Sequence, residues 1–355
     1  MGTFHCLCTA LAKFSNEKSL NKIDWKTVKR VLVVRLRSIG DAVLATPSLI
    51  ALRRFLPDAQ IDILLEDWVA PVLEGFETVD NILTVGKTNQ SRLQTAWQLR
   101  RNKYDVAFNL HGGTTGTFFV RASGAKHLVG FASYQYSFLY NHLAPTPQEF
   151  WQQEKVHSAE QQLALLGSVG IPVEDKPKSK LAIPEKSHIR SSKFPFALIH
   201  PAAAFATKQW SAENFAEIAE YLVQNGLQVV AIGTRKESKT IDKLIQNSKV
   251  PIQSYDNLTL PQVINLASRA KIFVGNDSGI AHIAAAVQTP SVVIFGSSNR
   301  AHWSPWTDAP HQIVYEEFDC QPCPGYVCEK FGEPKCILSV KPESVIAAIE
   351  KILKK

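Results

Sequence analysis

The amino-acid sequence predicts an α/β fold with two parallel-sheet domains. Short apolar strands alternate with amphipathic helices in the first half of the chain, and the alternation resumes in the second half. Such alternation is typical of parallel strands joined by crossover helices. The pattern stops between residues 171 and 195, which contain Pro172, Pro177, Pro184 and five lysines. This break therefore predicts a linker between two domains.

The break and the two alternating sets divide the chain into five parts. They are an N-terminal extension at residues 1–29, a Rossmann-like domain at 30–172, a linker at 173–195, a second Rossmann-like domain at 196–340 and a C-terminal helix at 341–355. Two similar halves of this kind place ligands in the cleft, at the carboxyl ends of the strands.

The first domain opens with a charge-free strand at residues 31–34, followed by helical periodicity at residues 41–55 that stops before Pro57. Its further elements are strands at residues 60–65, 81–85 and 104–110 and a helix at 92–101. The second domain contains strands at residues 196–200, 228–232, 272–274 and 291–295 and helices at 212–224, 236–245, 261–269 and 280–287. An amphipathic helix at residues 342–353 ends the chain.

The composition is that of a globular, moderately basic protein. The 355 residues are 45% hydrophobic and carry a formal charge of +7, with a pI near 9.0. Such a charge suits an anionic substrate or an anionic membrane surface. No basic aromatic repeat or helix-turn-helix pattern supports a nucleic-acid partner. We find no spanning segment or signal peptide and expect a cytoplasmic protein.

The segment from Gly275 to His282, Gly-Asn-Asp-Ser-Gly-Ile-Ala-His, is the most informative of the chain. It predicts a strand, a tight turn and a helix whose N-cap is Asp277 or Ser278. Gly279 lets a ligand approach the backbone closely. Free amides at a helix N-terminus attract a diphosphate, so we expect a nucleotide or nucleotide-sugar here. Similar junctions also occur in α/β proteins that bind nothing there.

A second cluster, Arg-Leu-Arg-Ser-Ile-Gly-Asp at residues 35–41, follows the first strand. Asp41 has two interpretations. It is either a helix N-cap worth about 1 kcal/mol, or a general base that faces the cleft, with Arg35 or Arg37 contacting an anionic acceptor.

A third segment, residues 200–210, follows the first strand of the second domain and ends in Thr207-Lys208-Gln209-Trp210. This small-residue loop precedes a helix capped by Ser211, so it predicts a phosphate clamp with Lys208 as its cation. The alternative is a solvated lysine beside a core tryptophan.

Four cysteines cluster near the C-terminus, with the spacing C-x2-C-x4-C-x7-C. In a cytosolic chain such a cluster is consistent with a structural zinc site, a redox-sensitive pair or packed thiols. The sequence leaves these three alternatives open. The residues are Cys320, Cys323, Cys328 and Cys336.

Taken together, these segments resemble glycosyltransferase family 9, the lipopolysaccharide heptosyltransferases. Residues 33–47, Val-Val-Arg-Leu-Arg-Ser-Ile-Gly-Asp-Ala-Val-Leu-Ala-Thr-Pro, look like the family's N-terminal signature. Residues 208–210 are similar to its Lys-x-Trp element, and residues 275–282 resemble its most specific motif. The cysteine cluster also recurs in many members. The match covers about residues 30–340 in consistent order.

The resemblance implies a GT-B fold and an inverting, metal-independent glycosyltransferase. Its implied reaction moves a heptose from ADP-L-glycero-β-D-manno-heptose to the inner core of lipopolysaccharide, with Asp41 as the catalytic base. The implied donor-binding residues are Thr207, Lys208, Glu237, Asp277, Ser278, Gly279 and His282. The implied acceptor-binding residues are Arg35, Arg37, Ser38 and Gly40. Because an unpaired carboxylate would repel a diphosphate, we expect Asp277 to cap its helix or to hold local amides.

The implied partners are a nucleotide-sugar donor and an anionic glycolipid acceptor, with peripheral contact to the cytoplasmic face of the inner membrane. No cofactor and no metal are implied. The chain departs from the family at Ser211, where proline is common, and at residues 295–298, which read Phe-Gly-Ser-Ser instead of Phe-Gly-Pro-Thr. Residues 111–114, His-Gly-Gly-Thr, form either a simple glycine turn, which we favour, or an acceptor contact.

Two other functions remain open. One is a GT-B glycosyltransferase or epimerase that uses another nucleotide-sugar. The other is a non-catalytic nucleotide-binding protein.

Overall fold

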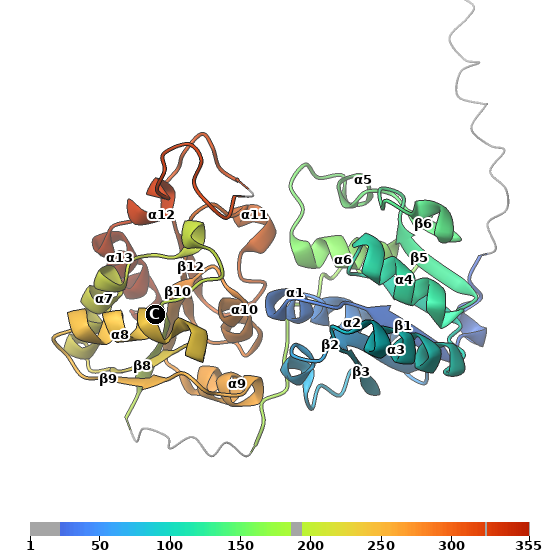
Figure 1. The fold of residues 1–355 in the computed structure, drawn as a ribbon, viewed down its shortest axis with the longest axis horizontal. Coiled ribbons are helices and arrows are strands. Elements are labelled where there is room, and N and C mark those ends of the chain that lie inside the picture. Colours follow the sequence, from blue (N-terminus) through green and yellow to red (C-terminus); the bar gives the residue numbers. More distant parts are fainter. Residues whose placement is uncertain (1–21, 186–193, 324, 355) are drawn as a thin grey trace, which may run out of the picture.

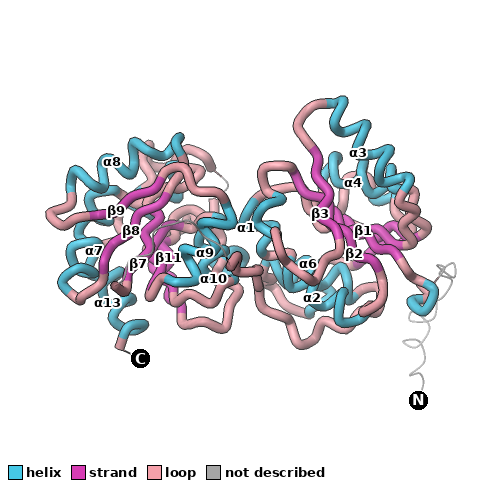
Figure 2. The backbone as a smooth tube through the Cα atoms, turned by 90° about the horizontal axis from the view of Figure 1, so that it is seen from below, coloured by secondary structure: helices cyan, strands magenta, loops and turns pink. Residues whose placement is uncertain are grey.

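Two α/β domains lie side by side in the computed structural model, which describes residues 22–185, 194–323 and 325–354 (Figure 1). Each domain contains a six-stranded sheet in which every pair of neighbouring strands is parallel. Helices cover the strands of both sheets (Figure 2). The predicted α/β fold class is therefore confirmed.

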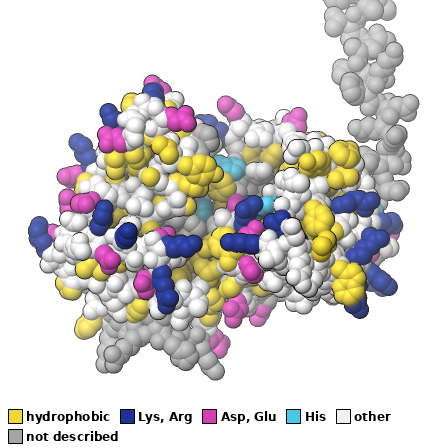
Figure 3. Space-filling view, viewed as in Figure 1, with side chains coloured by type: hydrophobic (Ala, Val, Ile, Leu, Met, Phe, Trp, Pro, Cys, Tyr) yellow, Lys and Arg dark blue, Asp and Glu magenta, His cyan; other side chains and the backbone are white. Residues whose placement is uncertain are grey.

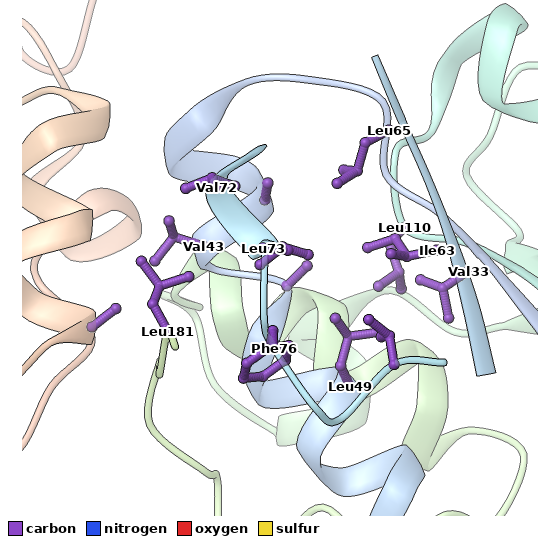
Figure 4. Packing of buried hydrophobic residues seen from close by; sticks show 14 of the residues in the cluster. Val33, Val43, Leu49, Ile63, Leu65, Val72, Leu73, Phe76, Leu110 and Leu181 are labelled. Atoms are coloured by element: carbon purple, nitrogen blue, oxygen red, sulfur yellow. The ribbon is translucent and has the colours of Figure 1, made fainter. Parts of the chain in front are cut away.

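The first domain has the strand order β3-β2-β1-β4-β5-β6. Its core includes Val33 of β1, Ile63 of β2 and Leu49 of α2, which Figure 4 shows packed together. Its elements are β1 (Arg30–Val34), α1 (Ile39–Val43), α2 (Thr46–Phe55), β2 (Gln60–Glu66), β3 (Asn81–Val85), α3 (Asn89–Arg101), β4 (Val106–Asn109), α4 (Gly113–Ser123), β5 (His127–Phe131), β6 (His142–Ala144), α5 (Pro147–Trp151) and α6 (Ser158–Gly167).

The second domain repeats this design with the order β12-β11-β10-β7-β8-β9. Its elements are β7 (Phe196–His200), α7 (Ala212–Gln224), β8 (Gln228–Ile232), α8 (Ser238–Asn247), β9 (Ile252–Tyr255), α9 (Leu260–Arg269), β10 (Ile272–Asn276), α10 (Gly279–Ala286), β11 (Ser291–Ile294), α11 (Arg300–Trp303), β12 (His311–Val314), α12 (Lys335–Leu338) and α13 (Pro342–Leu353).

In each sheet the strand order reverses beside the first strand of the domain. The reversal lies between β1 and β4 in the first domain and between β7 and β10 in the second. Ligands of doubly wound sheets bind at the carboxyl ends of the strands at such a point. The three motifs singled out in the sequence follow β1, β7 and β10, so the topology brings all of them to the expected binding edges.

The helix predicted at residues 41–55 is two helices, α1 and α2. Pro47 lies in the first turn of α2, where its missing N–H is tolerated. The Thr46 hydroxyl donates a 2.7 Å hydrogen bond to the Val43 carbonyl at the junction. The first helix begins at Ile39, two residues earlier than predicted, which places Asp41 inside the helix instead of at its cap.

The two ends of the described chain pack on the domains next to them. Residues 22–29, which we assigned to the extension, bury Ile23 and Val28 in the first domain. Trp25 there donates a 3.0 Å hydrogen bond to the Val169 carbonyl. Residues 1–21 of the predicted extension lie outside the described residues.

Helix α13 has the bounds predicted for it and packs into the apolar core of the second domain. No helix among the described residues is long and apolar enough to cross a membrane.

Candidate active site

A cavity of about 530 Å³ lies between the two domains, at the carboxyl ends of β1, β7 and β10. Figure 3 shows a hollow between the domains with histidine side chains inside it. Most of the predicted site residues line this cavity although they come from distant parts of the chain. Those that line it are Ser38, Gly40, Asp41, Lys208, Glu237, Asp277, Ser278, Gly279 and His282.

The floor of the cavity is the contact between α1 of the first domain and α10 of the second. A Cβ atom on Gly40 would lie 2.7 Å from Cδ2 of His282, and one on Gly279 would lie 3.2 Å from the Gly40 nitrogen. Real Cβ atoms do not tolerate the shorter of these distances. Both glycines are therefore needed for the two helices to approach this closely.

Asp41 stands on the first-domain wall in a fixed orientation. The backbone N–H and the hydroxyl of Ser38 lie 3.0 Å and 3.2 Å from Asp41 Oδ2 and donate to it. The Arg35 guanidinium forms an ion pair with the other carboxylate oxygen. Ser38 is the N-cap residue of α1, and Asp41 is the third residue of that helix. The interpretation of Asp41 as the N-cap residue is therefore wrong, although its carboxylate forms a capping box with Ser38. The carboxylate still faces the cavity.

The two predicted acceptor arginines lie in different environments. Arg35 is buried, and its NH1 atom lies 3.2 Å from Nδ1 of His111. Burial, followed by the charge of Arg35, lowers the pKa of His111 to about 4, so this ring is neutral at pH 7. The Arg37 side chain is 61% exposed and lies 3.7 Å from the Glu66 carboxylate. Neither arginine lines the cavity.

The turn at residues 111–114 has the glycine conformations that we favoured from the sequence. Gly112 and Gly113 adopt φ values of +69° and +62°, which side chains disfavour. The same turn places His111 against Arg35, so the glycine turn also supports the wall behind Asp41.

On the second-domain wall, Lys208 and Asp277 form an ion pair of 2.9 Å between Nζ and Oδ2. Ser298 donates a further hydrogen bond to the same carboxylate oxygen. Asp277 was expected to cap α10 or hold local amides, and this expectation is wrong. Its carboxylate instead holds the lysine side chain, 69 residues away in the sequence, at the edge of the cavity.

The N-terminus of α10 has no side-chain cap. Ser278 is the N-cap residue, but its side chain makes no capping hydrogen bond. Its hydroxyl lies 3.2 Å from Nδ1 of His200 instead. The first amides of the helix thus point toward the cavity without a side-chain acceptor, which favours an anion at this position.

His200 is a cavity residue that sequence reasoning missed as a functional residue. It is buried, and burial lowers its pKa to about 4. Its Nε2 atom lies 4.0 Å from the carboxylate of Glu237. Its position as the last residue of β7, at the binding edge of the sheet, was the signal that could have identified it.

Glu237 lines the cavity from the segment that follows β8 in the second domain. Its Oε2 atom accepts hydrogen bonds from the backbone N–H and the hydroxyl of Thr234, at 2.7 and 2.9 Å. These bonds fix the side chain through Oε2, and no hydrogen bond to Oε1 is found among the described residues.

His282 is buried at the base of the cavity, and its Nδ1 atom has no hydrogen-bond partner among the described residues. Burial lowers the pKa of its ring. A buried polar atom of this kind is costly unless water or a ligand satisfies it. Its position beside Asp277 and Asp41 therefore points to an occupant of the cavity.

The remaining wall is apolar and was not predicted from the sequence. Side chains of β8, α9, α10, α11 and loops of both domains form a surface that can receive a flat, apolar ring face. These residues are scattered over distant segments and, apart from Phe205 and Ile280, lie outside the motifs singled out in the sequence, so no local signal distinguishes them. They are Trp68, Phe205, Ile232, Leu258, Leu260, Val263, Ile280 and Trp303.

Thr207 does not line the cavity. Its hydroxyl donates a 2.9 Å hydrogen bond to the Gly325 carbonyl and accepts a 3.0 Å hydrogen bond from the Ser297 hydroxyl. The backbone N–H of Cys323 donates a 3.0 Å hydrogen bond to the Ser297 carbonyl. The cysteine-containing loop therefore supports the segment that carries Thr207 and Lys208.

The cysteines themselves are free thiols in the structure. Among residues 22–185, 194–323 and 325–354, no group of three or more His, Cys, Asp or Glu side chains is arranged to hold a metal ion. The zinc alternative thus gains no support from the geometry of the described chain. Burial, followed by the nearby Cys323, raises the pKa of the Cys336 thiol, which favours a packed, protonated thiol there.

Comparisons with known proteins identify the family of the chain. The model of glycosyltransferase family 9 (heptosyltransferase) matches residues 92–331. Lipopolysaccharide heptosyltransferase 3 of Escherichia coli K12 is 28% identical, over 90% of this chain and 96% of that protein. Lipooligosaccharide heptosyltransferase 2 of Campylobacter jejuni is 26% identical, over 88% of this chain and 96% of that protein.

Comparison with solved structures also finds a heptosyltransferase. The structure of the E. coli ADP-heptose lipopolysaccharide heptosyltransferase II superposes with a TM-score of 0.76 at 22% identity, over 92% of this chain and 98% of that one. This likeness confirms the GT-B arrangement of two Rossmann-like domains. The family match covers more than half of the chain and includes the Lys208 and Asp277 motifs that meet in the cavity. The chain therefore belongs to glycosyltransferase family 9 and is a glycosyltransferase.

Proposed function

We propose that the protein transfers a heptose from ADP-L-glycero-β-D-manno-heptose to the inner core of lipopolysaccharide, with inversion at the anomeric carbon. One observation carries this proposal. A single cavity has the Asp41 carboxylate on its first-domain wall and Lys208 with an uncapped helix N-terminus on its second-domain wall. The names of the similar proteins, which act on lipopolysaccharide or lipooligosaccharide, support the substrate.

The second domain offers a partner for each part of an ADP-sugar. The apolar wall formed by β8 and α9 suits the adenine. Glu237 presents a free carboxylate oxygen that suits a ribose hydroxyl. The diphosphate suits the amides at Ser278 and Gly279, with Lys208 beside them.

The chemical step uses the two opposite walls. The acceptor hydroxyl transfers its proton to Asp41 as its oxygen forms a bond to the anomeric carbon. The bond between that carbon and the diphosphate oxygen breaks, and its electron pair leaves with ADP. Because the base and the phosphate seat face each other across the sugar, attack comes from the side opposite the leaving group, which inverts the anomeric configuration. Arg35 orients the base through its ion pair.

The negative charge that develops on ADP needs a positive environment. Lys208 and the N-terminus of α10 supply it from fixed positions, so the step needs no metal ion. Such preorganised charge stabilises the transition state more than the bound donor. In this proposal Asp277 holds the lysine in place until the diphosphate arrives.

We place the reaction on the cytoplasmic face of the inner membrane, with the protein bound peripherally. The acceptor is an anionic glycolipid, and the formal net charge of +7 favours binding to an anionic surface.

The test is transfer by mass spectrometry, with the protein, ADP-heptose and heptose-deficient lipopolysaccharide core in the absence of added metal. Wild type is expected to add one heptose mass, and Asp41→Asn is expected to lower turnover about 100-fold or more. Thr146→Ala is the matched control, because it removes the capping hydrogen bonds of α5, none of whose residues lines the cavity. It is expected to cost stability and to retain turnover.

Lack of transfer to every truncated core would reject the heptosyltransferase proposal. Isomerisation of the sugar without transfer would indicate an epimerase. Equal transfer by wild type and a folded Asp41→Asn would reject Asp41 as the base.

A further inference from the structure

The charge of the chain is concentrated in one segment of the first domain. Residues 81–148 contain a single acidic residue, Asp105, and seven basic ones, so they carry +6 of the chain's formal charge of +7. The remaining residues are almost electrically balanced. The basic residues of the segment are Lys87, Arg92, Arg100, Arg101, Lys103, Arg121 and Lys126.

These seven cations are exposed, and none of them forms an ion pair with a carboxylate within the described part of the chain. The Asp105 carboxylate instead accepts hydrogen bonds of 2.8 and 2.9 Å from the backbone amides of Lys29 and Arg30. The positive charge of the segment is thus left for a partner outside the molecule.

Helix α3 exposes two large apolar side chains and buries only two residues. Leu93 and Trp97 are 67% and 63% exposed and lie one turn apart, so they share a face. The buried residues of the helix, Thr95 and Leu99, lie on the opposite face. A surface helix normally has the reverse arrangement. The outward face of α3 is therefore suited to contact with something other than water.

Helix α4 packs against α3 and continues this surface. Phe118 on α4 is 42% exposed and, with Arg92 and Leu93 of α3, lines an open groove of about 470 Å³. The Arg101 guanidinium lies 4.4 Å from the ring centroid of Trp97. Apolar and cationic side chains are thus interleaved on the outer face of α3 and α4. Figure 3 shows yellow and dark-blue patches together on this domain, in the view in which Figure 1 labels α3 and α4.

One end of this surface lies at the sheet edge that carries Asp41. Helices α3 and α4 begin after β3 and β4, at the same carboxyl edge of the sheet from which Asp41 faces the cavity. His111, in the turn between β4 and α4, contacts Arg35 behind Asp41. The part of the surface near Arg92 and the groove therefore lies on the acceptor side of the sheet, whereas Arg101 and Arg121, in the last turns of the two helices, lie toward the opposite edge.

We propose that the outer face of α3 and α4 docks the protein on an anionic lipid bilayer. The arginines and lysines contact lipid phosphates, while Leu93, Trp97 and Phe118 enter the interface between headgroups and acyl chains. Tryptophan is favoured at this depth because its ring is apolar and its N–H is polar. The near absence of carboxylates removes the repulsion that an anionic surface would otherwise exert.

This inference deepens the proposed function, because a glycolipid acceptor is presented by a membrane. Its test measures binding without any sugar transfer, so the two proposals fail separately. The full-length protein is sedimented with vesicles of phosphatidylethanolamine and phosphatidylglycerol, or with vesicles of phosphatidylcholine alone. Wild type is expected to bind the anionic vesicles at least tenfold better, and to lose this preference at about 0.5 M salt.

Charge reversal tests the electrostatic part. Arg101→Glu/Arg121→Glu is expected to weaken binding to anionic vesicles about 25-fold or more, since each basic residue near the surface contributes about fivefold. Lys239→Glu/Lys243→Glu makes the same change of charge on α8 of the second domain, where both lysines are exposed. That control is expected to retain binding. Equal losses in the two variants would overturn the proposal, because net charge alone would then explain them.

Polar substitution tests the apolar part. Leu93→Ser/Trp97→Ser is expected to weaken binding at least tenfold, whereas Ile245→Ser, at an exposed isoleucine of α8, is expected to leave it unchanged. Unchanged vesicle binding in Leu93→Ser/Trp97→Ser would overturn the proposal. The same holds if the substitutions convert a dimer into a monomer without weakening vesicle binding, because the surface would then contact a second copy of the chain.

A second readout ties the surface to the reaction. Transfer to an acceptor embedded in anionic vesicles is expected to fall in Leu93→Ser/Trp97→Ser. Transfer to the same acceptor dispersed in detergent is expected to stay at the wild-type rate, because these residues lie outside the cavity. Equal loss in both formats would contradict a role in docking.

Discussion

Gly40 of α1 and Gly279 of α10 lie against each other across the two domains, so closely that a Cβ atom on Gly279 would stand 3.2 Å from the Gly40 nitrogen. This contact sets the spacing between the cavity wall that carries Asp41 and the wall that carries the helix N-terminus. Groups that act on opposite sides of one sugar must be placed to within a fraction of an ångström. The pair therefore links the packing of the domains to the chemistry.

We predict that Gly279→Ala lowers turnover at least tenfold in a protein that still folds. The new methyl group would also lie 3.0 Å from Cβ of Ile39, so α1 and α10 must separate by some tenths of an ångström. Steady-state kinetics and thermal unfolding are the measurements. Gly86→Ala is the control. A Cβ atom on Gly86 would lie closest to the side chain of Ser91, so this substitution leaves the contact between the two domains unchanged. Turnover near the wild-type rate in Gly279→Ala would show that the spacing is not critical.

The Lys208–Asp277 pair gives a prediction about stability and donor binding together. Lys208→Ala leaves a buried carboxylate without its cation and is expected to cost about 2–3 kcal/mol of unfolding free energy. It is also expected to weaken ADP binding at least tenfold, because the diphosphate loses a charge partner. Lys208→Ala/Asp277→Asn is expected to regain much of the stability but not the ADP affinity. Urea unfolding and calorimetric titration measure the two effects.

A matched control for this prediction is the half-buried ion pair between Lys176 and Glu160, far from the cavity. Lys176→Ala is expected to reduce stability and to leave ADP affinity unchanged. If Lys208→Ala binds ADP as wild type does, Lys208 has no role in holding the diphosphate.

Glu237 gives a prediction about the donor's ribose. The bonds from Thr234 hold one carboxylate oxygen, and we predict that the other accepts a hydrogen bond from a ribose hydroxyl. Wild type is expected to prefer ADP over its dideoxyribose analogue by about tenfold or more, since a hydrogen bond to a charged acceptor contributes about 1.5–3 kcal/mol. Glu237→Ala is expected to abolish this preference. A preference that persists in the variant would assign ribose binding to other groups.

His157 gives a prediction about pH. Its Nε2 atom lies 2.8 Å from the Ser304 carbonyl of the second domain, and its ring stacks on Trp306 at 4.5 Å between centroids. Its Nδ1 atom accepts from the Ala159 N–H at 3.1 Å, which requires a neutral ring. Burial lowers the pKa of this histidine from 6.5 to about 4.

Because the unfolded chain binds the proton first, the stability that the neutral ring of His157 confers is complete above pH 6.5. It is lost as the pH falls to about 4. The loss is on the order of 3 kcal/mol. His157→Gln is expected to show a smaller decline of the unfolding free energy over this range, measured by urea unfolding at several pH values. Equal declines in the two proteins would contradict the prediction.

The sequence predicted the elements best where a short charge-free apolar run or a clear amphipathic period stands out from polar neighbours. Helix α13 has its predicted bounds, and the strands β7 and β8 do as well. Residues 111–170 were not divided into elements, although they contain α4, β5, β6, α5 and α6. Much of this stretch has almost no acidic residues, so the contrast that marks amphipathic helices is weak there.

The candidate site was predictable in part because its motifs follow strands. Residues at the carboxyl ends of parallel strands converge, which is why the motifs after β1, β7 and β10 line one cavity. The sequence could not identify the apolar wall, because its residues come from distant segments of both domains that meet only in the folded chain. It also placed Thr207 in the donor site, whereas its hydroxyl is bonded to Gly325 and Ser297 in a supporting loop.

By itself, the sequence determined the α/β architecture, the order of the elements and the motifs that place the chain in its family, since these depend on local residue patterns. Only the tertiary structure decided which side chains become partners. The carboxylate of Asp277 pairs with Lys208, that of Asp41 with Arg35, and Gly40 meets Gly279. Such contacts depend on how the sheets and domains pack, and this packing is the sum of many weak apolar contacts that no short segment encodes.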